Sequence, residues 1–151
     1  MPHSSAHAPI VAWYATHARD LPWRRRDASP WSVLVSEVML QQTPVNRVLP
    51  VYEGWLRRWP TPSALAHDSL GAAVRQWGRL GYPRRAQRLW QAAGVIDSHF
   101  DGEVPSTYDE LRSLPGVGDY TAAAVAAFAY RSRAVVLDTN VRRVLARLFA
   151  G

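Results

Sequence analysis

The stretch 31–40 constrains the fold of this 151-residue chain most strongly, because it is apolar almost throughout and yet contains one carboxylate, Glu37. The apolar residues on either side of Glu37 are Trp31, Val33, Leu34, Val35, Val38, Met39 and Leu40. A helix through these positions is apolar on most of its circumference, as helices in protein cores are. A glutamate in such a helix either points outward or serves chemistry, and the pattern alone favours the outward orientation.

Helical periodicity recurs along the whole chain, and the only strand-like alternation is the short stretch 133–138. We therefore predict an all-α protein. Ser106, followed three residues later by Asp109, predicts a capping-box start for one helix. The predicted helices cover residues 6–19, 31–42, 45–59, 62–66, 70–80, 84–100, 108–113, 120–131 and 139–149.

Length and composition predict one soluble domain in residues 6–151, preceded by a disordered N-terminus at residues 1–5. No apolar run is long enough to span a membrane. The N-terminus lacks the pattern of a signal peptide, and the chain contains no cysteine. These features predict a cytoplasmic protein without a membrane partner.

The formal net charge is +6, and all 18 basic residues are arginine. Clusters such as 24–26 and 84–85 suit phosphate contacts through the planar guanidinium, which makes nucleic acid a plausible partner. A solvated basic face is the alternative that composition leaves open.

The string LPGVG at residues 114–118 precedes an alanine-rich helix. Gly116 and Gly118 permit positive φ angles, so the backbone N–H groups of Gly116, Val117 and Gly118 can converge on a phosphate oxygen. An ordinary turn between two helices is the alternative. Further along, Asp138 starts an amphipathic helix, where it can be the N-cap, a catalytic carboxylate or both.

Four strings together carry a family resemblance: SEVMLQQT (36–43), LGYPRRA (80–86), LPGVGDYTA (114–122) and LDTNVRRVLAR (137–147). They resemble the helix-hairpin-helix DNA glycosylases, and specifically the adenine DNA glycosylases of the MutY type, which remove adenine mispaired with 8-oxoguanine. The resemblance covers about residues 20–148. It implies a six-helix barrel core with the hairpin at about 114–122, acting on double-stranded DNA in the cytoplasm, associated with the nucleoid.

The resemblance assigns roles to three residues. Glu37 matches the catalytic acid, and burial would raise its pKa so that it can protonate a flipped adenine. Asp138 matches the carboxylate that stabilises the oxocarbenium-like state. Tyr120 stands where bifunctional relatives of the endonuclease III type carry a Schiff-base lysine. Because the chain has no lysine, a monofunctional glycosylase is expected.

The remaining site residues also follow from the resemblance. Trp23 and Arg24 resemble residues that flank the adenine pocket, and Asn140 matches an asparagine that supports the aspartate. Residues expected to contact the DNA, besides the hairpin, are Leu40, Gln42, Thr43, Tyr82 and Arg85.

The family usually carries a [4Fe–4S] cluster on four cysteines and a C-terminal domain that recognises 8-oxoguanine. This chain has no cysteine, so we expect no metal or cofactor on its residues and interpret it as an N-terminal catalytic-core fragment. A monomer is expected, with the apolar face of Ile10, Val11, Trp13 and Tyr14 partly exposed. Two alternatives remain: a thymine or uracil mismatch glycosylase of the same superfamily, and an inactive DNA-binding module.

Overall fold

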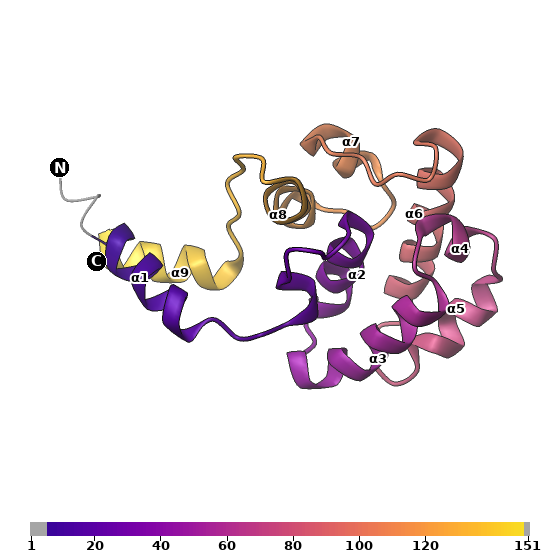
Figure 1. Ribbon diagram of the computed structural model, residues 1–151, viewed down its shortest axis with the longest axis horizontal. Helices are drawn as coiled ribbons and strands as arrows, with labels where there is room; N and C mark the ends of the chain where they lie inside the picture. The colour runs from indigo at the N-terminus through magenta and orange to yellow at the C-terminus, as the bar shows by residue number, and fades with distance from the viewer. Residues whose placement is uncertain (1–5, 150–151) are drawn as a thin grey trace.

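The computed structural model describes residues 6–149, and the described residues contain helices and no strands (Figure 1). The all-α prediction is therefore confirmed, whereas the prediction for residues 1–5 lies outside the described part. The elements are α1 (His7–His17), the 3-10 turn η2 (Pro22–Arg24), α2 (Pro30–Leu40), α3 (Val45–Arg58), α4 (Pro62–Ala66), α5 (Leu70–Trp77), α6 (Arg84–His99), α7 (Tyr108–Ser113), α8 (Asp119–Tyr130) and α9 (Thr139–Phe149).

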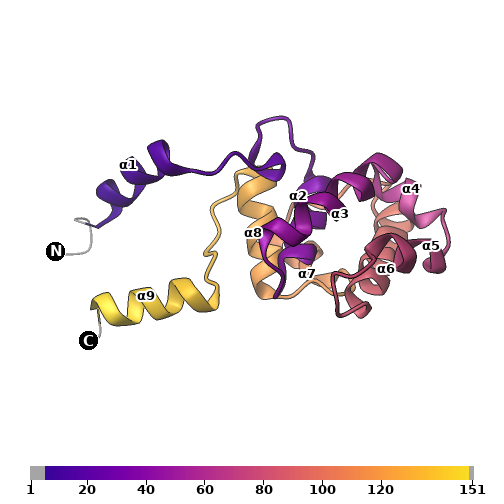
Figure 2. The same cartoon turned by 90° about the horizontal axis from the view of Figure 1, so that it is seen from below.

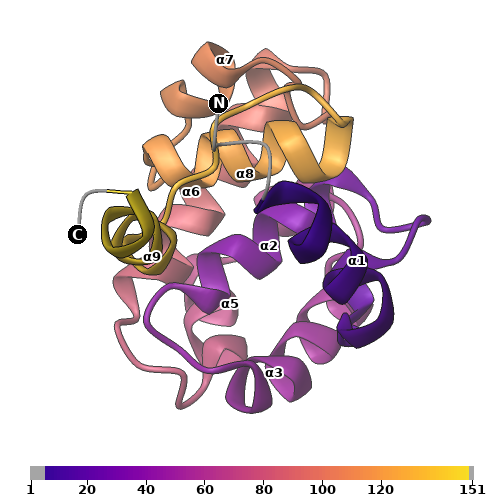
Figure 3. The same ribbon diagram turned by 90° about the vertical axis from the view of Figure 1, so that its left-hand side faces the viewer.

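Helix α2 lies inside the helical body, in contact with α3, α6, α8 and η2 (Figure 3). Every residue from Trp31 to Met39 is buried, as its apolar circumference requires. The helix starts at Pro30, and the Ser29 side chain caps it by accepting a hydrogen bond from the Ser32 backbone N–H at 3.1 Å. Its last turn is buried as well, so the C-terminal carbonyls of α2 must find partners inside the protein.

Tryptophans form much of the core beside α2. Trp55, Trp59 and Trp77 are fully buried, and their rings meet edge to face at centroid distances of 4.6 Å and 5.8 Å. Trp31 donates its indole N–H to the carbonyl of Trp59 at 3.0 Å, which ties α2 to the end of α3. These large buried rings thus fix the spacing between α2, α3 and α5, while the indole N–H of Trp55 has no hydrogen-bond partner among the described residues.

Helices α1 and α9 lie beside this body rather than within it (Figures 1 and 2). Neither contains a buried residue. The predicted exposure of the α1 face is confirmed, since Ile10, Val11, Trp13 and Tyr14 are 48–60% exposed. The segment 131–138 connects α8 to α9 without regular structure and brings Asp138 back toward the body.

Six helices, α1, α2, α3, α5, α6 and α8, differ from their predicted bounds by one to three residues, the most at α5, which ends at Trp77 instead of residue 80. The cap of α7 also differs from the prediction. The capping box of α7 uses Thr107 and Glu110 instead of Ser106 and Asp109: the Thr107 hydroxyl accepts from the Glu110 N–H at 3.3 Å and donates to its carboxylate at 2.7 Å. Helix α2 ends at Leu40, two residues early, because Gln42 takes a positive φ of 56° that no right-handed helix tolerates.

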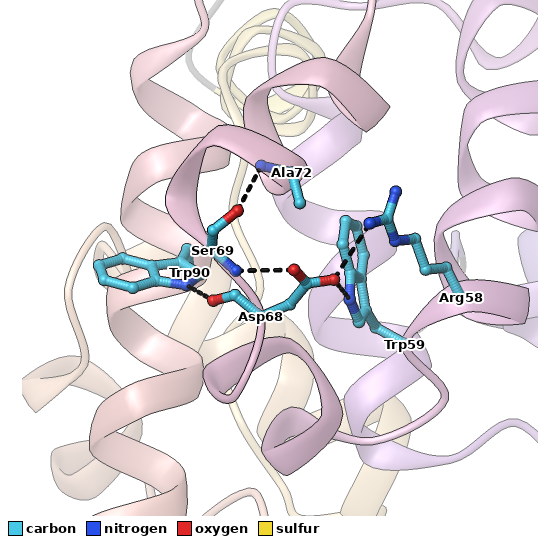
Figure 4. Close-up of polar contacts among 6 residues, drawn as sticks. All are labelled: Arg58, Trp59, Asp68, Ser69, Ala72 and Trp90. Carbon is cyan, nitrogen blue, oxygen red and sulfur yellow. Dashed lines mark hydrogen bonds and ion pairs between the residues drawn. The ribbon is translucent and has the colours of Figure 1, made fainter.

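Asp68 joins three helices at the edge of the core (Figure 4). Its carboxylate accepts from the Ser69 backbone N–H at 2.7 Å, from Trp59 Nε1 at 3.0 Å and from Arg58 Nη2 at 3.2 Å. Its backbone carbonyl accepts from Trp90 Nε1 at 2.9 Å. The hydrogen bond from Ser69, followed by that from Trp59, holds the pKa of Asp68 below its ordinary value of 3.8.

A lowered pKa in the folded state means that ionised Asp68 stabilises the fold above pH 3.8, and that this contribution disappears as the pH falls through the folded-state pKa. We expect Asp68→Asn to lower the free energy of unfolding most above pH 4, with a smaller deficit at pH 2–3. Urea unfolding at a series of pH values measures this. Asp27→Asn, at an exposed loop carboxylate, is the control, and a deficit independent of pH for Asp68→Asn would contradict the prediction.

Truncation of the central helix should destabilise the whole body. Leu34 is fully buried, so Leu34→Ala is expected to lower the free energy of unfolding by about 2–5 kcal/mol through lost contacts and an unfilled cavity. Val74→Ala, at a 39% exposed position on α5, should change it by less than about 0.5 kcal/mol. Urea unfolding followed by tryptophan fluorescence tests both variants, and equal effects would disprove the central position of α2.

Candidate active site

A cleft of about 1090 Å³ opens between α2, α8, the loop around η2 and the start of α9. We call it the α2–α8 cleft. Eight residues predicted from the sequence line it, although they come from positions 23 to 140. They are Trp23, Arg24, Glu37, Leu40, Gln42, Tyr120, Asp138 and Asn140.

Glu37 faces this cleft from the buried helix α2 and is only 8% exposed. The outward orientation favoured by the pattern alone is therefore wrong, and the orientation implied by the family resemblance is confirmed. Burial raises the pKa of Glu37 from 4.5 to about 7, against the smaller opposing effects of a hydrogen bond with Tyr120 and the charge of Arg24. The carboxyl group therefore retains a proton in a large fraction of molecules near neutral pH.

Tyr120 stands in the first turn of α8, where the hairpin ends, and is 37% exposed. Burial raises its pKa to about 12, and the charges of Glu37 and Asp138 act in the same direction. The phenol hydroxyl is consequently protonated at neutral pH and can donate to a carboxylate. Two acidic residues 101 positions apart in the sequence thus act on one hydroxyl group.

Asp138 is the N-cap of α9. Its Oδ1 accepts a hydrogen bond from the Val141 backbone N–H at 2.7 Å, and its carbonyl accepts from the Arg142 N–H at 3.0 Å. The residue also lines the α2–α8 cleft. Within residues 6–149, no hydrogen bond reaches Oδ2, so one carboxylate oxygen positions the residue while the other is available to a ligand.

The hairpin agrees with the expectation only in part. Gly116 has a φ of +76°, and a Cβ there would lie 2.7 Å from the Cβ of Arg88, so glycine is required. Gly118 has an ordinary φ of −90°. The Val117 N–H donates to the Leu114 carbonyl at 3.1 Å, and the Val117 side chain is buried. Of the three amides predicted to bind phosphate, that of Val117 is thus engaged in the turn.

Arg85 and Thr43 differ most from the prediction. Both are buried, with exposures of 9% and 6%, and Arg85 Nη2 donates to the Thr43 hydroxyl at 2.9 Å. The guanidinium points to the C-terminal end of α2, where backbone carbonyls lack partners within the helix. The predicted direct DNA contact by these two side chains is incompatible with this placement.

The other predicted contact residues lie at the surface or at the cleft. Gln42 and Tyr82 are exposed, Tyr82 at 67%, and Leu40 lines the cleft. Trp23 is buried edge to face against Tyr52 at 5.0 Å, so it is a cleft wall with one side in the core.

Sequence reasoning missed Phe128, which lines the cleft from α8 and is 58% exposed. The alanine-rich helix gave no periodicity from which its orientation could be read. It also missed Gln41, whose side-chain amide donates to Thr121 Oγ1 at 3.3 Å and joins the end of α2 to α8.

The family that the sequence resembles holds its iron–sulfur cluster on cysteine thiolates. This chain has no cysteine, so its residues offer no such ligands. In the described range, no three His, Asp or Glu side chains gather as a metal site would require. No helix between residues 6 and 149 is long and apolar enough to cross a membrane.

Comparisons with known proteins agree with this geometry. A family model described as "HhH-GPD superfamily base excision DNA repair protein" matches residues 35–151. An adenine DNA glycosylase of Mycobacterium tuberculosis is 57% identical over 142 residues, which are 94% of this chain and 47% of that protein. The adenine DNA glycosylase of Homo sapiens is 44% identical over 149 residues, 93% of this chain and 27% of that protein. The chain thus spans about half the length of the mycobacterial relative.

Solved structures show the same fold. A thermostable thymine-DNA glycosylase superposes with a TM-score of 0.88 at 29% identity, covering 95% of this chain and 66% of that one. An endonuclease III in a non-covalent complex with DNA superposes with a TM-score of 0.80 at 25% identity, covering 96% of this chain and 68% of that one.

The raised pKa of Glu37 has a consequence for stability. Because the folded-state value of about 7 lies above the ordinary 4.5, protonated Glu37 is favoured in the fold, and the free energy of unfolding falls as the pH rises from about 4.5 to about 7. A difference of this size corresponds to about 3 kcal/mol. Glu37→Gln should remove this loss. Urea unfolding should therefore show that the free energy of unfolding of the variant, relative to that of the parent, increases between pH 5 and pH 8.

Glu53→Gln, at an exposed glutamate of α3, provides the matched control and should follow the parent at every pH. If Glu37→Gln and the parent lose stability in parallel between pH 5 and pH 8, Glu37 does not carry the raised pKa.

Proposed function

The chain belongs to the HhH-GPD superfamily of base excision DNA repair proteins, and from this premise we propose that it is a DNA glycosylase that removes adenine from a mispaired duplex. The observation that carries the proposal is Glu37, a carboxyl group with a pKa of about 7 that faces an open cleft together with Tyr120 and Asp138. The relatives at 57% and 44% identity, both named adenine DNA glycosylases, support the choice of base.

The proposed reaction begins with adenine extruded from the duplex into the α2–α8 cleft, since the base cannot be reached inside the stack. Glu37 transfers its proton to a ring nitrogen of adenine, which turns a poor leaving group into a good one. The bond between that base and C1′ then breaks, and its electron pair leaves with adenine. The burial that raises the pKa of Glu37 is what makes this proton available at neutral pH.

Bond cleavage leaves positive charge on the sugar, and Asp138 is the carboxylate proposed to stabilise it. Its Oδ1 is fixed by the Val141 N–H, Oδ2 has no hydrogen bond among the described residues, and the residue lines the cleft. Water then adds to C1′ and loses a proton, which gives an abasic site. A lysine imine cannot form on this chain because it has no lysine, so hydrolysis without strand cleavage is the proposed outcome.

The partner is proposed to be double-stranded DNA in which adenine lies opposite 8-oxoguanine or guanine. Arg24, Arg25 and Arg26 line the mouth of the cleft, where they provide positive charge for the phosphates beside the extruded base. The preference for the opposite base rests on the family resemblance of SEVMLQQT, because no described feature of the cleft selects between the two guanines.

A thymine mismatch glycosylase is the second candidate, favoured by the TM-score of 0.88 to the thermostable thymine-DNA glycosylase. That structure is 29% identical to this chain, against 57% for the mycobacterial adenine enzyme. A buried acid is moreover of most use to a purine, whose departure is assisted by ring protonation. We therefore place adenine first.

Single-turnover release of adenine from a duplex with one 8-oxoguanine·adenine pair tests the proposal, with alkali added to cut abasic sites. We expect the parent to give alkali-dependent cleavage and Glu37→Gln to be slower by about 100-fold or more, the usual loss of a general acid. Above pH 7 the parental rate should fall about tenfold per pH unit, because the active form is the protonated one.

Asp138→Asn retains the capping geometry and removes only the charge, so it should also lose activity while its melting temperature changes little. A duplex with a guanine·thymine pair is the control for base choice. Faster release of thymine than of adenine would favour the second candidate, and binding without release of either base would identify a DNA-binding module.

A further inference from the structure

Arg85 is a buried cation that has no carboxylate partner among the described residues. It lies in the first turn of α6, and both of its terminal nitrogens donate to oxygens of the protein itself. Nη1 donates to the carbonyls of Val38 (3.2 Å), Met39 (2.9 Å) and Gln41, whereas Nη2 donates to Thr43 Oγ1 (2.9 Å) and to the carbonyls of Leu80 (3.5 Å) and Gly81 (3.1 Å).

These acceptors belong to two separate segments. One comprises the end of α2 and the loop 41–44, which we call the α2–α3 loop, and the other is the loop 78–83, the α5–α6 loop. One planar guanidinium therefore joins two loops whose sequences lie about 40 residues apart. A second bond, from Arg47 Nη2 to the Arg79 carbonyl at 2.6 Å, also connects α3 to the α5–α6 loop.

Each loop carries an exposed residue in the left-handed backbone region. Gln42 has a φ of 56° and lies between Gln41 and Thr43, which both accept hydrogen bonds from Arg85. Tyr82 has a φ of 47° and directly follows Gly81, whose carbonyl also accepts from Arg85. The carbonyl of Tyr82 also accepts from the Arg85 backbone N–H at 3.0 Å. Non-glycine residues hold such conformations only where the surrounding contacts enforce them.

Two aromatic rings also lie near the guanidinium. Its central carbon is 5.1 Å from the ring centroid of the buried Trp77 and 5.8 Å from that of the exposed Tyr82. Arg85 thereby contacts the ring of Tyr82 as well as its backbone. Lysine could not replace it, because an ammonium group lacks both the planar fork and the stacking face.

We propose that Arg85 is a positioning residue, which locks the α2–α3 and α5–α6 loops together so that Gln42 and Tyr82 project from them in fixed orientations. Gln42 lines the α2–α8 cleft, and Tyr82 is 67% exposed. The inference rests on the proposed function, since the object that these two side chains meet is the mispaired duplex. Arg85 acts through them and does not touch the DNA.

The test compares binding of a duplex containing one 8-oxoguanine·adenine pair with binding of the matched duplex, by fluorescence anisotropy at several salt concentrations. All proteins carry Glu37→Gln so that the substrate is not consumed. We expect Arg85→Lys, which retains the charge, to lose at least tenfold in selectivity for the mispaired duplex. We expect Arg85→Met, which removes the positive charge, to leave the slope of log Kd against log salt concentration unchanged.

A phosphate contact predicts the opposite pattern. Arg85→Lys would then keep its selectivity, and Arg85→Met would reduce the slope by about 0.9. Arg84→Met removes the same charge from the exposed neighbouring position, and it should affect the mispaired and matched duplexes alike. Retained selectivity in Arg85→Lys overturns the inference.

Thr43→Val keeps the test decisive if Arg85 variants fold poorly. It removes one acceptor of the guanidinium while leaving the shape and charge of the loop nearly unchanged. Thr43→Val is expected to lose less selectivity than Arg85→Lys. The double variant should lose no more than Arg85→Lys alone, because both substitutions break the same contact. Full selectivity in Thr43→Val, measured on protein whose melting temperature and circular dichroism match the parent, would count against the inference.

The two proposals fail differently. A parent chain that prefers the mispaired duplex but releases no adenine would remove the proposed function and leave the positioning role of Arg85 intact. A parent chain with no preference for the mispaired duplex would overturn the positioning role.

Discussion

The burial of α2 from Trp31 to Met39 is the constraint on which the rest of the structure depends. A helix that is apolar on nearly every side needs neighbours on nearly every side, and α3, α6, α8 and η2 supply them. The same burial deprives Glu37 of water, which raises its pKa to about 7. The environment that makes this helix a core element thus also keeps its single carboxyl group protonated in a large fraction of molecules near neutral pH.

Burial of the C-terminal end of α2 creates a second requirement. A buried carbonyl without a partner costs about 1–3 kcal/mol, and Arg85 satisfies those of Val38, Met39 and Gln41 together. A left-handed non-glycine residue costs a similar amount, about 1–3 kcal/mol. The hydrogen bonds from one guanidinium therefore offset a cost of the same order as the strain at Gln42 and Tyr82. One residue thus contacts both the end of the central helix and the two loops that carry Gln42 and Tyr82.

The sequence was sufficient for the fold class, for most helix positions and for the residues that meet in the cleft, because these follow from periodicity and from strings specific to a family. It did not reveal the direction of individual polar side chains. Arg85 sits in an arginine pair that resembles a phosphate contact, yet the unpaired carbonyls of α2 attract it inward. That these carbonyls need a partner within the protein can be predicted only when the end of the helix is known to be buried. The shift of the α7 capping box to Thr107 has a similar origin, because adjacent residues offered two compatible pairs.

Tyr120 is influenced by both carboxyl groups of the cleft, through a hydrogen bond with Glu37 and through the charge of Asp138. Its pKa of about 12, raised by burial and by the charges of Glu37 and Asp138, prevents it from losing its proton to either carboxylate at neutral pH. The titratable proton is instead on Glu37, whose pKa of about 7 is the one near physiological pH. A lysine at the position of Tyr120 would add a positive charge beside Glu37 and favour its ionised form. A neutral donor at this position is therefore compatible with a protonated Glu37 in a way that a cation is not.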